Sequence, residues 1–278
     1  MVKWQDVRCS VIASLEENSI QDAALEADLL FELITKTKAL GQKDYIFTDE
    51  QESNLYSFLE KRVAGYPIQY LFEEWHFLDF SVQVGPGVLI PRQDTEIVCE
   101  QAIFLGSKMD NTPTNIIDLC SGSGIIAITM KKAFPSANVT AVEKEESAFD
   151  YLKRNTCENN IVAKQGDVFF YQEELERERI DIIVSNPPYL TAEDMRNLQK
   201  ELTHEPAEAL YGGEDGLLFY KHITNAYFSC LKKGGVLVFE IGNKQKEAVI
   251  SLCEQAGFAE IGSKKDYNGN NRCVWAIK

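Results

Sequence analysis

Residues 180–189 read IDIIVSNPPY and decide the fold of this chain. Four of residues 180–184, namely Ile180, Ile182, Ile183 and Val184, are β-branched, which is typical of a strand buried on both faces of a parallel sheet. Pro187 and Pro188 lack a backbone N–H and have a fixed φ, so the strand must end at Asn186. Ligands of open α/β sheets bind at the carboxyl ends of the strands. The corner, which ends in the ring of Tyr189, is therefore either an ordinary strand-ending turn or a site.

Strands and helices alternate from residue 115 onward. The expected strands cover residues 115–119, 138–143, 161–167, 180–186, 236–241, 259–264 and 273–277. A helix over residues 217–231 precedes the fifth of them. This rhythm predicts an α/β fold with a doubly wound, mostly parallel seven-stranded sheet.

Residues 1–74 have the pattern of a small helical domain. Apolar residues recur at helical spacing between residues 4 and 15. Asp22 is predicted to cap a second helix, and Thr48–Gln51 forms a capping-box pattern before a third. The segment contains seven basic and fourteen acidic side chains and no glycine-rich loop. It is either a docking module or a purely structural domain.

Residues 75–90 are expected to form a β-hairpin linker between this helical domain and a domain spanning residues 91–278. The linker has strand-like content and ends in Gly-Pro-Gly, a turn signal. Pro91 then breaks an apolar run, and Asp94 or Thr95 is predicted to cap the next helix. Arg92 and Asp94 are either solvated or face a pocket at the domain junction.

Composition excludes several classes of protein. The chain has 45% hydrophobic and 26% charged residues, as globular proteins do. No apolar stretch approaches the ~20 residues needed to span a bilayer, and no signal peptide opens the chain, so a cytoplasmic protein without membrane contact is expected. The seven cysteines and three histidines are scattered, which argues against disulfides and against a metal site. A net charge of −15 argues against a nucleic-acid partner.

A glycine-rich turn follows the first strand of the predicted sheet. Gly122-x-Gly124-x-x-Ala127 satisfies the dinucleotide fingerprint, but this match alone is weak. Asp118 precedes the glycines, and its carboxylate would repel a pyrophosphate and attract a cationic amine.

Acidic side chains also follow the next two strands. Glu143 is placed to accept both hydroxyls of a ribose, in NAD or in S-adenosylmethionine. Asp167 and Val168 offer a carboxylate and an apolar surface to an adenine ring, although a plain turn explains them equally well.

These residues together resemble class I S-adenosylmethionine-dependent methyltransferases. Asn186–Tyr189 narrows the resemblance to enzymes that methylate a planar, conjugated nitrogen. Residues 88–96, 205–217 and 266–272 are similar to motifs of the peptide chain release factor glutamine methyltransferases. Gln93, the Cys120-Ser121 pair, Glu143 and Val168 depart from the commonest residues of that family.

The resemblance implies a Rossmann-like methyltransferase sheet, S-adenosylmethionine as methyl donor, peptide chain release factors as protein substrate, and a monomer. It implies three sets of site residues and no metal. The catalytic set is Asn186, Pro187 and Tyr189. The cofactor-binding set is Asp118, Cys120, Ser121, Gly122, Ser123, Gly124, Glu143, Asp167, Val168 and Asn186. The substrate-binding set is Asn186, Pro187, Pro188, Tyr189 and Arg92.

The Asn-Pro-Pro-Tyr corner suggests how an unreactive amide is methylated. The Asn186 side-chain oxygen and the Pro187 carbonyl would each accept one N–H of the substrate –NH2, and Tyr189 would stack on the amide plane. Both acceptors direct the nitrogen lone pair at the methyl group.

Three other interpretations stay open at this point. A nucleic-acid amino-group methyltransferase would use the same chemistry on an exocyclic nitrogen. An NAD-dependent oxidoreductase accounts for the glycine fingerprint and leaves the Asn186 corner unexplained. A non-enzymatic nucleotide-binding scaffold leaves that corner equally unexplained.

Overall fold

A computed structural model describes residues 2–278, and they divide into two compact units. The first unit contains the described residues up to Glu74 together with Gln199–His204. The second contains Trp75–Leu198 and Glu205–Lys278. The expected hairpin linker is thus part of the second unit, and the sequence pattern did not reveal that a segment near residue 200 belongs to the first.

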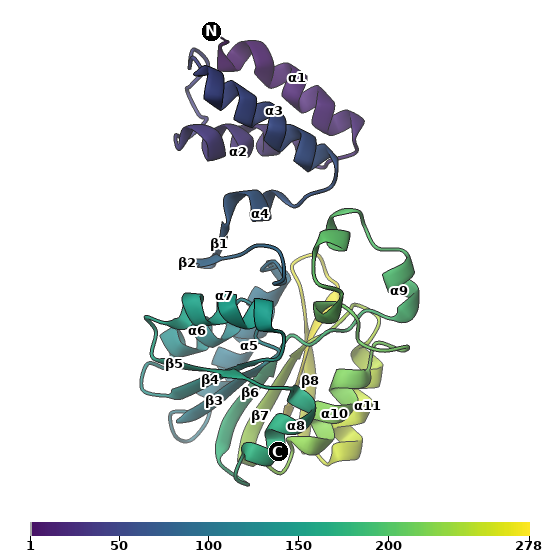
Figure 1. Cartoon of the computed structure of the whole chain (residues 1–278). Helices are drawn as coiled ribbons and strands as arrows, with labels where there is room; N and C mark the ends of the chain where they lie inside the picture. Colours follow the sequence, from purple (N-terminus) through teal and green to yellow (C-terminus); the bar gives the residue numbers. More distant parts are fainter. Residues whose placement is uncertain (1) are drawn as a thin grey trace. The chain divides into compact units, whose positions relative to one another are not determined.

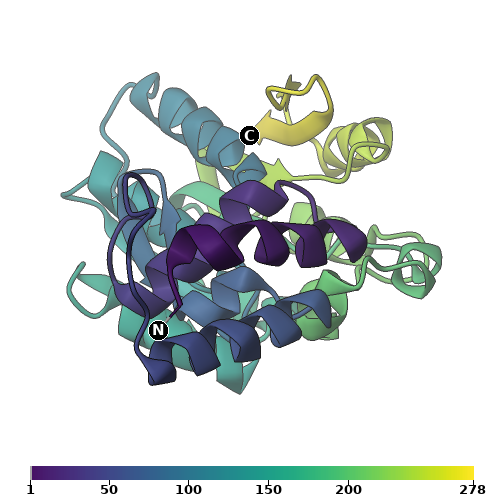
Figure 2. The ribbon, with the colours of Figure 1, turned by 90° about the horizontal axis from the view of Figure 1, so that it is seen from above.

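Three long helices make up most of the first unit. Its helices are α1 (Trp4–Glu17), α2 (Ala23–Thr35), α3 (Asp49–Val63), α4 (Ile68–Phe72) and the short 3-10 helix η2 (Glu201–His204). Helices α1, α2 and α3 pack side by side (Figures 1 and 2). Between them the rings of Trp4 and Phe31 lie 4.9 Å apart, and both side chains are fully buried. The predicted helical domain is therefore organised around an aromatic core.

Of the two helix caps predicted in this unit, one is present in the structure and the other is not. The capping box is confirmed, because the Thr48 hydroxyl accepts the N–H of Gln51 and the Gln51 side chain accepts the N–H of Thr48. The prediction that Asp22 caps α2 is wrong. Asp22 precedes the helix in a left-handed conformation, with φ of 53°, and its side chain makes no capping hydrogen bond.

The second unit is built on the predicted seven-stranded sheet. Its strands are β3 (Asn115–Leu119), β4 (Asn138–Glu143), β5 (Ile161–Gln165), β6 (Ile180–Ser185), β7 (Leu231–Glu240), β8 (Glu260–Lys265) and β9 (Asn271–Ile277). Their order is β5-β4-β3-β6-β7-β9-β8, and the pairings from β5 to β7 are parallel while β9 runs antiparallel to β7 and β8. The strand order reverses between β3 and β6, which places a ligand crevice at their carboxyl ends.

Helices cover both faces of this sheet (Figure 1). The remaining elements of the unit are β1 (Glu74–Phe77), β2 (Phe80–Gln83), α5 (Asp94–Ser107), α6 (Ile125–Ala133), α7 (Glu146–Thr156), α8 (Val168–Tyr171), η1 (Gln172–Glu174), α9 (Ala192–Arg196), η3 (Ala207–Ala209), α10 (Leu218–Ala226) and α11 (Lys246–Ala256). Strands β1 and β2 form a separate two-stranded sheet. Every residue of β6 is buried, which explains why this strand is an almost unbroken apolar run.

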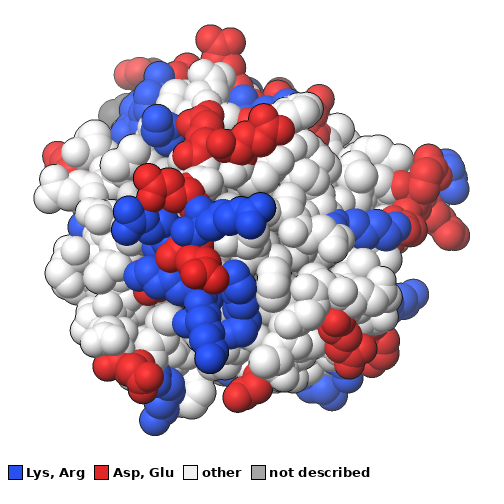
Figure 3. Space-filling view, turned by 90° about the horizontal axis from the view of Figure 1, so that it is seen from below, with Lys and Arg blue, Asp and Glu red and all other residues white. Residues whose placement is uncertain are grey.

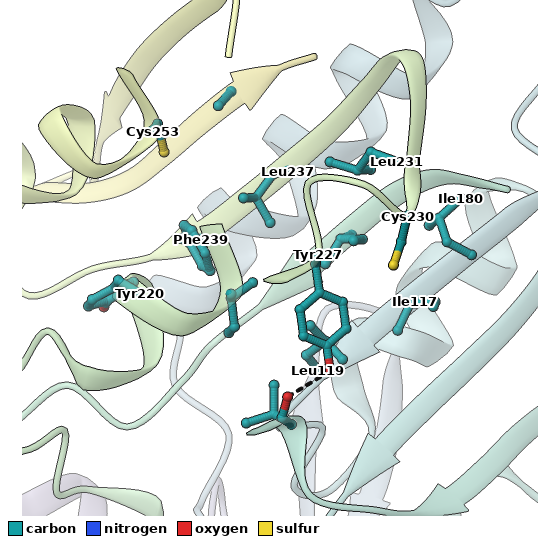
Figure 4. Close-up of a cluster of buried hydrophobic side chains, with 14 of the residues drawn as sticks. Ile117, Leu119, Ile180, Tyr220, Tyr227, Cys230, Leu231, Leu237, Phe239 and Cys253 are labelled. Atoms are coloured by element: carbon teal, nitrogen blue, oxygen red, sulfur yellow. Dashed lines mark hydrogen bonds between the residues drawn. The ribbon is translucent and has the colours of Figure 1, made fainter. Parts of the chain in front are cut away.

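The core on the α10 face of the sheet is rich in aromatic residues (Figure 4). Tyr220, Tyr227 and Phe239 are completely buried there. The Tyr227 hydroxyl donates to the carbonyl of Val168 at 2.8 Å, so the buried phenol is satisfied and ties α10 to the turn after β5 (Figure 4). This contact holds the end of β5 in place beside the crevice.

Several element boundaries differ from the predicted ones. Strand β5 ends at Gln165, because the Asp167 side chain accepts the N–H of Phe169 and starts a helical turn. Helix α10 ends at Ala226, five residues before the predicted end at 231. The prediction that Asp94 or Thr95 caps α5 is also wrong, since neither side chain makes a capping hydrogen bond.

The cysteines and acidic residues form no metal centre among residues 2–278. All seven cysteines are free thiols, and four of them are buried, namely Cys99, Cys230, Cys253 and Cys273. Among the described residues, no helix combines the length and the apolar character required to cross a bilayer.

Candidate active site

A cavity of about 620 Å³ opens in the second unit at the carboxyl ends of β3, β4 and β6. Its wall includes most of the site residues predicted from sequence, namely Arg92, Cys120, Ser121, Gly122, Ser123, Glu143, Asp167, Val168, Asn186 and Pro188. Asp118, Gly124, Pro187 and Tyr189 are not part of that wall. The crossover between β3 and β6 thus brings segments from five parts of the sequence to one place.

The glycine-rich loop after β3 is held in an unusual backbone conformation. Cys120, Gly122 and Gly124 all have positive φ, of 60°, 53° and 89°. A Cβ on Gly124 would come within 2.7 Å of Leu152, whereas a Cβ on Gly122 would meet only Val88, at 4.0 Å. Gly124 is therefore required for packing against α7, and Gly122 leaves open space at the cavity wall.

Glu143 fixes the conformation of this loop from the end of β4. One carboxylate oxygen accepts the N–H of Gly122 at 2.8 Å, and the other accepts those of Lys144 and Glu145 at 2.8 and 2.9 Å. Burial raises the pKa of Glu143, and the three N–H donors oppose that rise. The oxygen that faces Gly122 keeps a free lone pair for a ligand hydroxyl.

Asp167 and Val168 lie on the cavity wall beyond β5. One oxygen of Asp167 accepts the N–H of Phe169 at 3.0 Å, and the other lies 3.4 Å from the ammonium group of Lys144. Val168 is buried and presents its apolar surface to the same cavity.

Asp118 lies beneath the glycine-rich loop and has no exposed surface. One oxygen accepts the N–H of Ala127 at 3.1 Å, and the other is buried and has no hydrogen-bond partner among residues 2–278. Burial is the main cause that raises the pKa of Asp118 to about 8. Its predicted contact with a cofactor amine stays a prediction.

The Asn186 corner is held by contacts from two later parts of the chain, Gly212 and Gln245. The carbonyl of Tyr189 accepts the side-chain N–H of Gln245 at 2.9 Å, and a Cβ on Gly212 would lie 2.6 Å from both the Pro188 carbonyl oxygen and the Tyr189 Cα. The backbone at the corner therefore has little freedom. The ring of Tyr189 packs against the buried core of the sheet and does not line the cavity, and burial raises the pKa of its hydroxyl.

Arg92 is anchored by a residue that sequence reasoning missed. Its guanidinium forms an ion pair with Glu205, whose side chain is 1% exposed, and also donates to the carbonyl of Ile90 at 2.8 Å. The second oxygen of Glu205 accepts the N–H of Ile90 at 2.9 Å. Glu205 thereby holds Arg92 at the cavity wall. Its place in the motif at residues 205–217 was the only sequence signal for it.

Thr95 and Glu240 form a buried hydrogen bond, a second contact at the site, after Arg92–Glu205, that the sequence did not reveal. The Thr95 hydroxyl donates to Glu240 Oε2 at 2.6 Å, and the Asn186 side-chain Nδ2 lies 3.4 Å from the same hydroxyl oxygen. Thr95 and Glu240 are both almost fully buried. The failed prediction of a helix cap at Thr95 has its explanation here, because the hydroxyl is committed to Glu240.

Two protein families match parts of this chain. Residues 100–232 match the methyltransferase small domain, and residues 8–72 match the PrmC N-terminal domain. The fold agrees with a methyltransferase from Pyrococcus furiosus, whose crystal structure superimposes with a TM-score of 0.51 at 19% identity and covers 83% of this chain and 98% of that one. The family model and the fold both point to the methyltransferase class.

Closer relatives narrow the class to one family. A release factor glutamine methyltransferase from Thermodesulfovibrio yellowstonii is 37% identical over 232 residues, which are 82% of this chain and 82% of that protein. One from Fusobacterium nucleatum is 32% identical over 283 residues, which are 98% of this chain and 78% of that protein. The chain belongs to the release factor glutamine methyltransferase family.

Proposed function

We propose that this enzyme transfers a methyl group from S-adenosylmethionine to the side-chain amide nitrogen of the glutamine in the Gly-Gly-Gln motif of peptide chain release factors. The observation that carries the proposal is the position of Asn186. Its side chain lies at the cavity wall with the –NH2 end engaged by Thr95, so that the carbonyl oxygen is available to a substrate amide.

The groups on the cavity wall suit S-adenosylmethionine as the methyl donor. The open space beside Gly122 admits a ligand close to the backbone, and the free lone pair of Glu143 accepts a ribose hydroxyl. Val168 offers an apolar contact to an adenine ring. S-adenosylmethionine would supply an electrophilic methyl group when bound in this cavity, whose wall includes Asn186.

The protein then has to make an amide nitrogen nucleophilic. Its lone pair is delocalised into the carbonyl, and no side chain near neutral pH deprotonates it, so orientation has to supply the help. The Asn186 oxygen accepts one N–H of the substrate –NH2, and the Pro187 carbonyl accepts the other. The positive charge that moves to nitrogen as the sulfur–methyl bond breaks is stabilised by these two acceptors, and the methylated amide then releases one proton.

A protein substrate suits the charge of this enzyme better than a nucleic acid does. The net charge is −15, and on the face seen in Figure 3 the Lys and Arg side chains are interspersed with Asp and Glu. Nucleic-acid binding normally requires a continuous basic surface. We place the enzyme in the cytoplasm as a monomer that acts on soluble release factors.

The substrate can be identified by a radiolabelling experiment that locates the transferred methyl group. Enzyme and S-adenosylmethionine with a tritiated methyl group are incubated with release factor or with nucleic acid, and the product is digested and sequenced by mass spectrometry. We expect the label on the glutamine of the Gly-Gly-Gln motif. Label on a nucleobase, or none on the release factor, would refute the proposal.

The helical first unit is proposed to dock the release factor through its acidic surface. Glu16, Glu17 and Glu60 are exposed on α1 and α3. Their triple substitution by Gln should raise the KM for release factor and leave the KM for S-adenosylmethionine unchanged. The matched control replaces the exposed Glu173 and Glu174 of the second unit. An equal effect of both variants would argue against docking through this unit.

A further inference from the structure

The side chain of Asn186 has two ends, and only its carbonyl end can accept a hydrogen bond from a substrate amide. The ends have the same shape, so the shape of the pocket alone does not select between them. Something must hold the –NH2 end away from the substrate. Among the described residues, the hydrogen-bond acceptor of Asn186 Nδ2 is the hydroxyl of Thr95, at 3.4 Å.

Thr95 has a single hydroxyl proton, and its direction depends on Glu240. An ionised carboxylate can only accept, so the Thr95 proton must point at Glu240 Oε2, 2.6 Å away. The hydroxyl oxygen can then only accept from Asn186. An Asn186 carbonyl turned toward Thr95 would meet a lone pair and be repelled. While Glu240 is ionised, the hydrogen bonds can therefore run in one direction only: Asn186 donates to Thr95, and Thr95 donates to Glu240.

We propose that Glu240 is a positioning residue for methyl transfer, which acts through Thr95 to keep the carbonyl end of Asn186 directed at the substrate amide. Glu240 is buried, does not line the cavity and is hydrogen-bonded to Thr95, so its effect on the substrate passes through Thr95. The inference rests on the proposed function, because it explains how the Asn186 oxygen is oriented to accept an N–H of the substrate amide.

The groups that surround Glu240 come from β9, α5 and α10 and from the loops that contain Arg92 and Tyr189. Arg272 of β9 approaches it, and this arginine also pairs with Asp94 of α5 at 3.0 Å and with Asp266 at 3.4 Å. The other titratable or charged groups that face Glu240 are Arg92, Tyr189, Cys99 and Cys273. The Tyr220 hydroxyl donates to the backbone carbonyl of Glu240 at 2.8 Å and leaves the carboxylate to Thr95.

The arrangement is sensitive to protonation in the physiological range. Burial raises the pKa of Glu240 to about 7, against the opposing effects of the Thr95 hydrogen bond and of Arg272. A protonated Glu240 can donate to Thr95, and Thr95 can then donate to the carbonyl of Asn186 and turn the amide the wrong way. Methyl transfer therefore requires ionised Glu240 and should fall as the pH drops through about 7.

The test compares the wild-type enzyme with Glu240→Gln, Asn186→Ala and the double variant, with release factor as substrate and the pH varied. For Glu240→Gln we expect kcat to fall roughly 10- to 100-fold, the KM for S-adenosylmethionine to stay unchanged and the acidic limb of the pH profile near 7 to disappear. In the Asn186→Ala background, Glu240→Gln should cause no further loss, because Glu240 acts only through Asn186.

A second pair of variants covers the case in which Glu240→Gln does not fold. Thr95→Ser keeps the hydroxyl and should retain the acidic limb, while Thr95→Val removes the hydroxyl and should reproduce the loss of kcat. Additive losses in the double variant, or an acidic limb that persists in both Glu240→Gln and Thr95→Val, would overturn the inference. A wild-type enzyme that methylates no release factor would instead refute the proposed function.

Discussion

Arg62 Nη2 and Glu201 Oε1 lie 2.5 Å apart, although 139 residues separate them in the sequence. The same guanidinium donates twice to Glu26, at 2.5 and 2.9 Å, and the Arg62 side chain is only 3% exposed. One buried cation thus joins α2, α3 and the segment Gln199–His204 within the first unit.

We expect Arg62→Met to destabilise the first unit by about 2–3 kcal/mol, because it leaves Glu26 partly buried without its cation. Hydrogen exchange should accelerate in α2, α3 and residues 199–204. The control is Arg8→Met, which breaks a half-exposed pair with Asp28 and should cost less than about 1 kcal/mol. Exchange in residues 199–204 that matches the wild type would contradict this role.

Replacement of Asn186 by Ala should abolish most catalysis without loss of cofactor binding. The change removes one of two acceptors for the substrate –NH2, and the loss of one such group typically lowers kcat about 10²- to 10³-fold. Methyl transfer is measured with tritiated donor, and donor affinity by calorimetry. Turnover within a few-fold of the wild type would exclude Asn186 as the main acceptor.

Two glycines of the same loop should respond differently to substitution. Gly124→Ala should destabilise the second unit by about 2 kcal/mol or more, because its Cβ would overlap Leu152 at a positive φ. Gly122→Ala meets no such overlap, so it should cost only about 1 kcal/mol from its φ and mainly weaken S-adenosylmethionine binding. Denaturant unfolding and calorimetry separate the two effects, and each variant is the control for the other.

Asp181 should make stability dependent on pH in the acid range. Burial by itself would raise its pKa, but Lys232 at 2.7 Å and the N–H groups of Asn115 and Thr114 outweigh that effect and lower it. The native state therefore holds the proton less tightly than the unfolded chain. The resulting stability is present above about pH 4 and is lost as the pH falls through the lowered native pKa.

Asp181→Asn should accordingly lower the unfolding free energy at pH 7 by about 1–2 kcal/mol. The difference from the wild type should shrink toward pH 2, which urea unfolding at several pH values would detect. A constant difference between pH 7 and pH 2 would show that the effect is not carried by the charge of Asp181.

Local sequence was sufficient for much of the fold. The bounds of β6 were predicted to within one residue, with the end expected at Asn186 and found at Ser185. This succeeded because β-branched residues and the backbone restrictions of proline act over a few neighbouring positions. The same reasoning located the glycine-rich loop after β3 and Glu143 at the end of β4. Predictions of helix caps were less successful, since the Thr95 hydroxyl has a partner 145 residues away.

The sequence by itself determined that the residues at 120–124, 143, 167–168 and 186–189 reach the carboxyl edge of the sheet, because each group stands at the end of a predicted strand. Only the tertiary structure decided which way their side chains point. It packed the ring of Tyr189 against the core and placed Asp118 beneath the loop, and it brought Glu240, Thr95 and Asn186 into one hydrogen-bonded series. The physical reason is that the direction of a buried polar group depends on the partner it finds across the fold, and local sequence does not contain that partner.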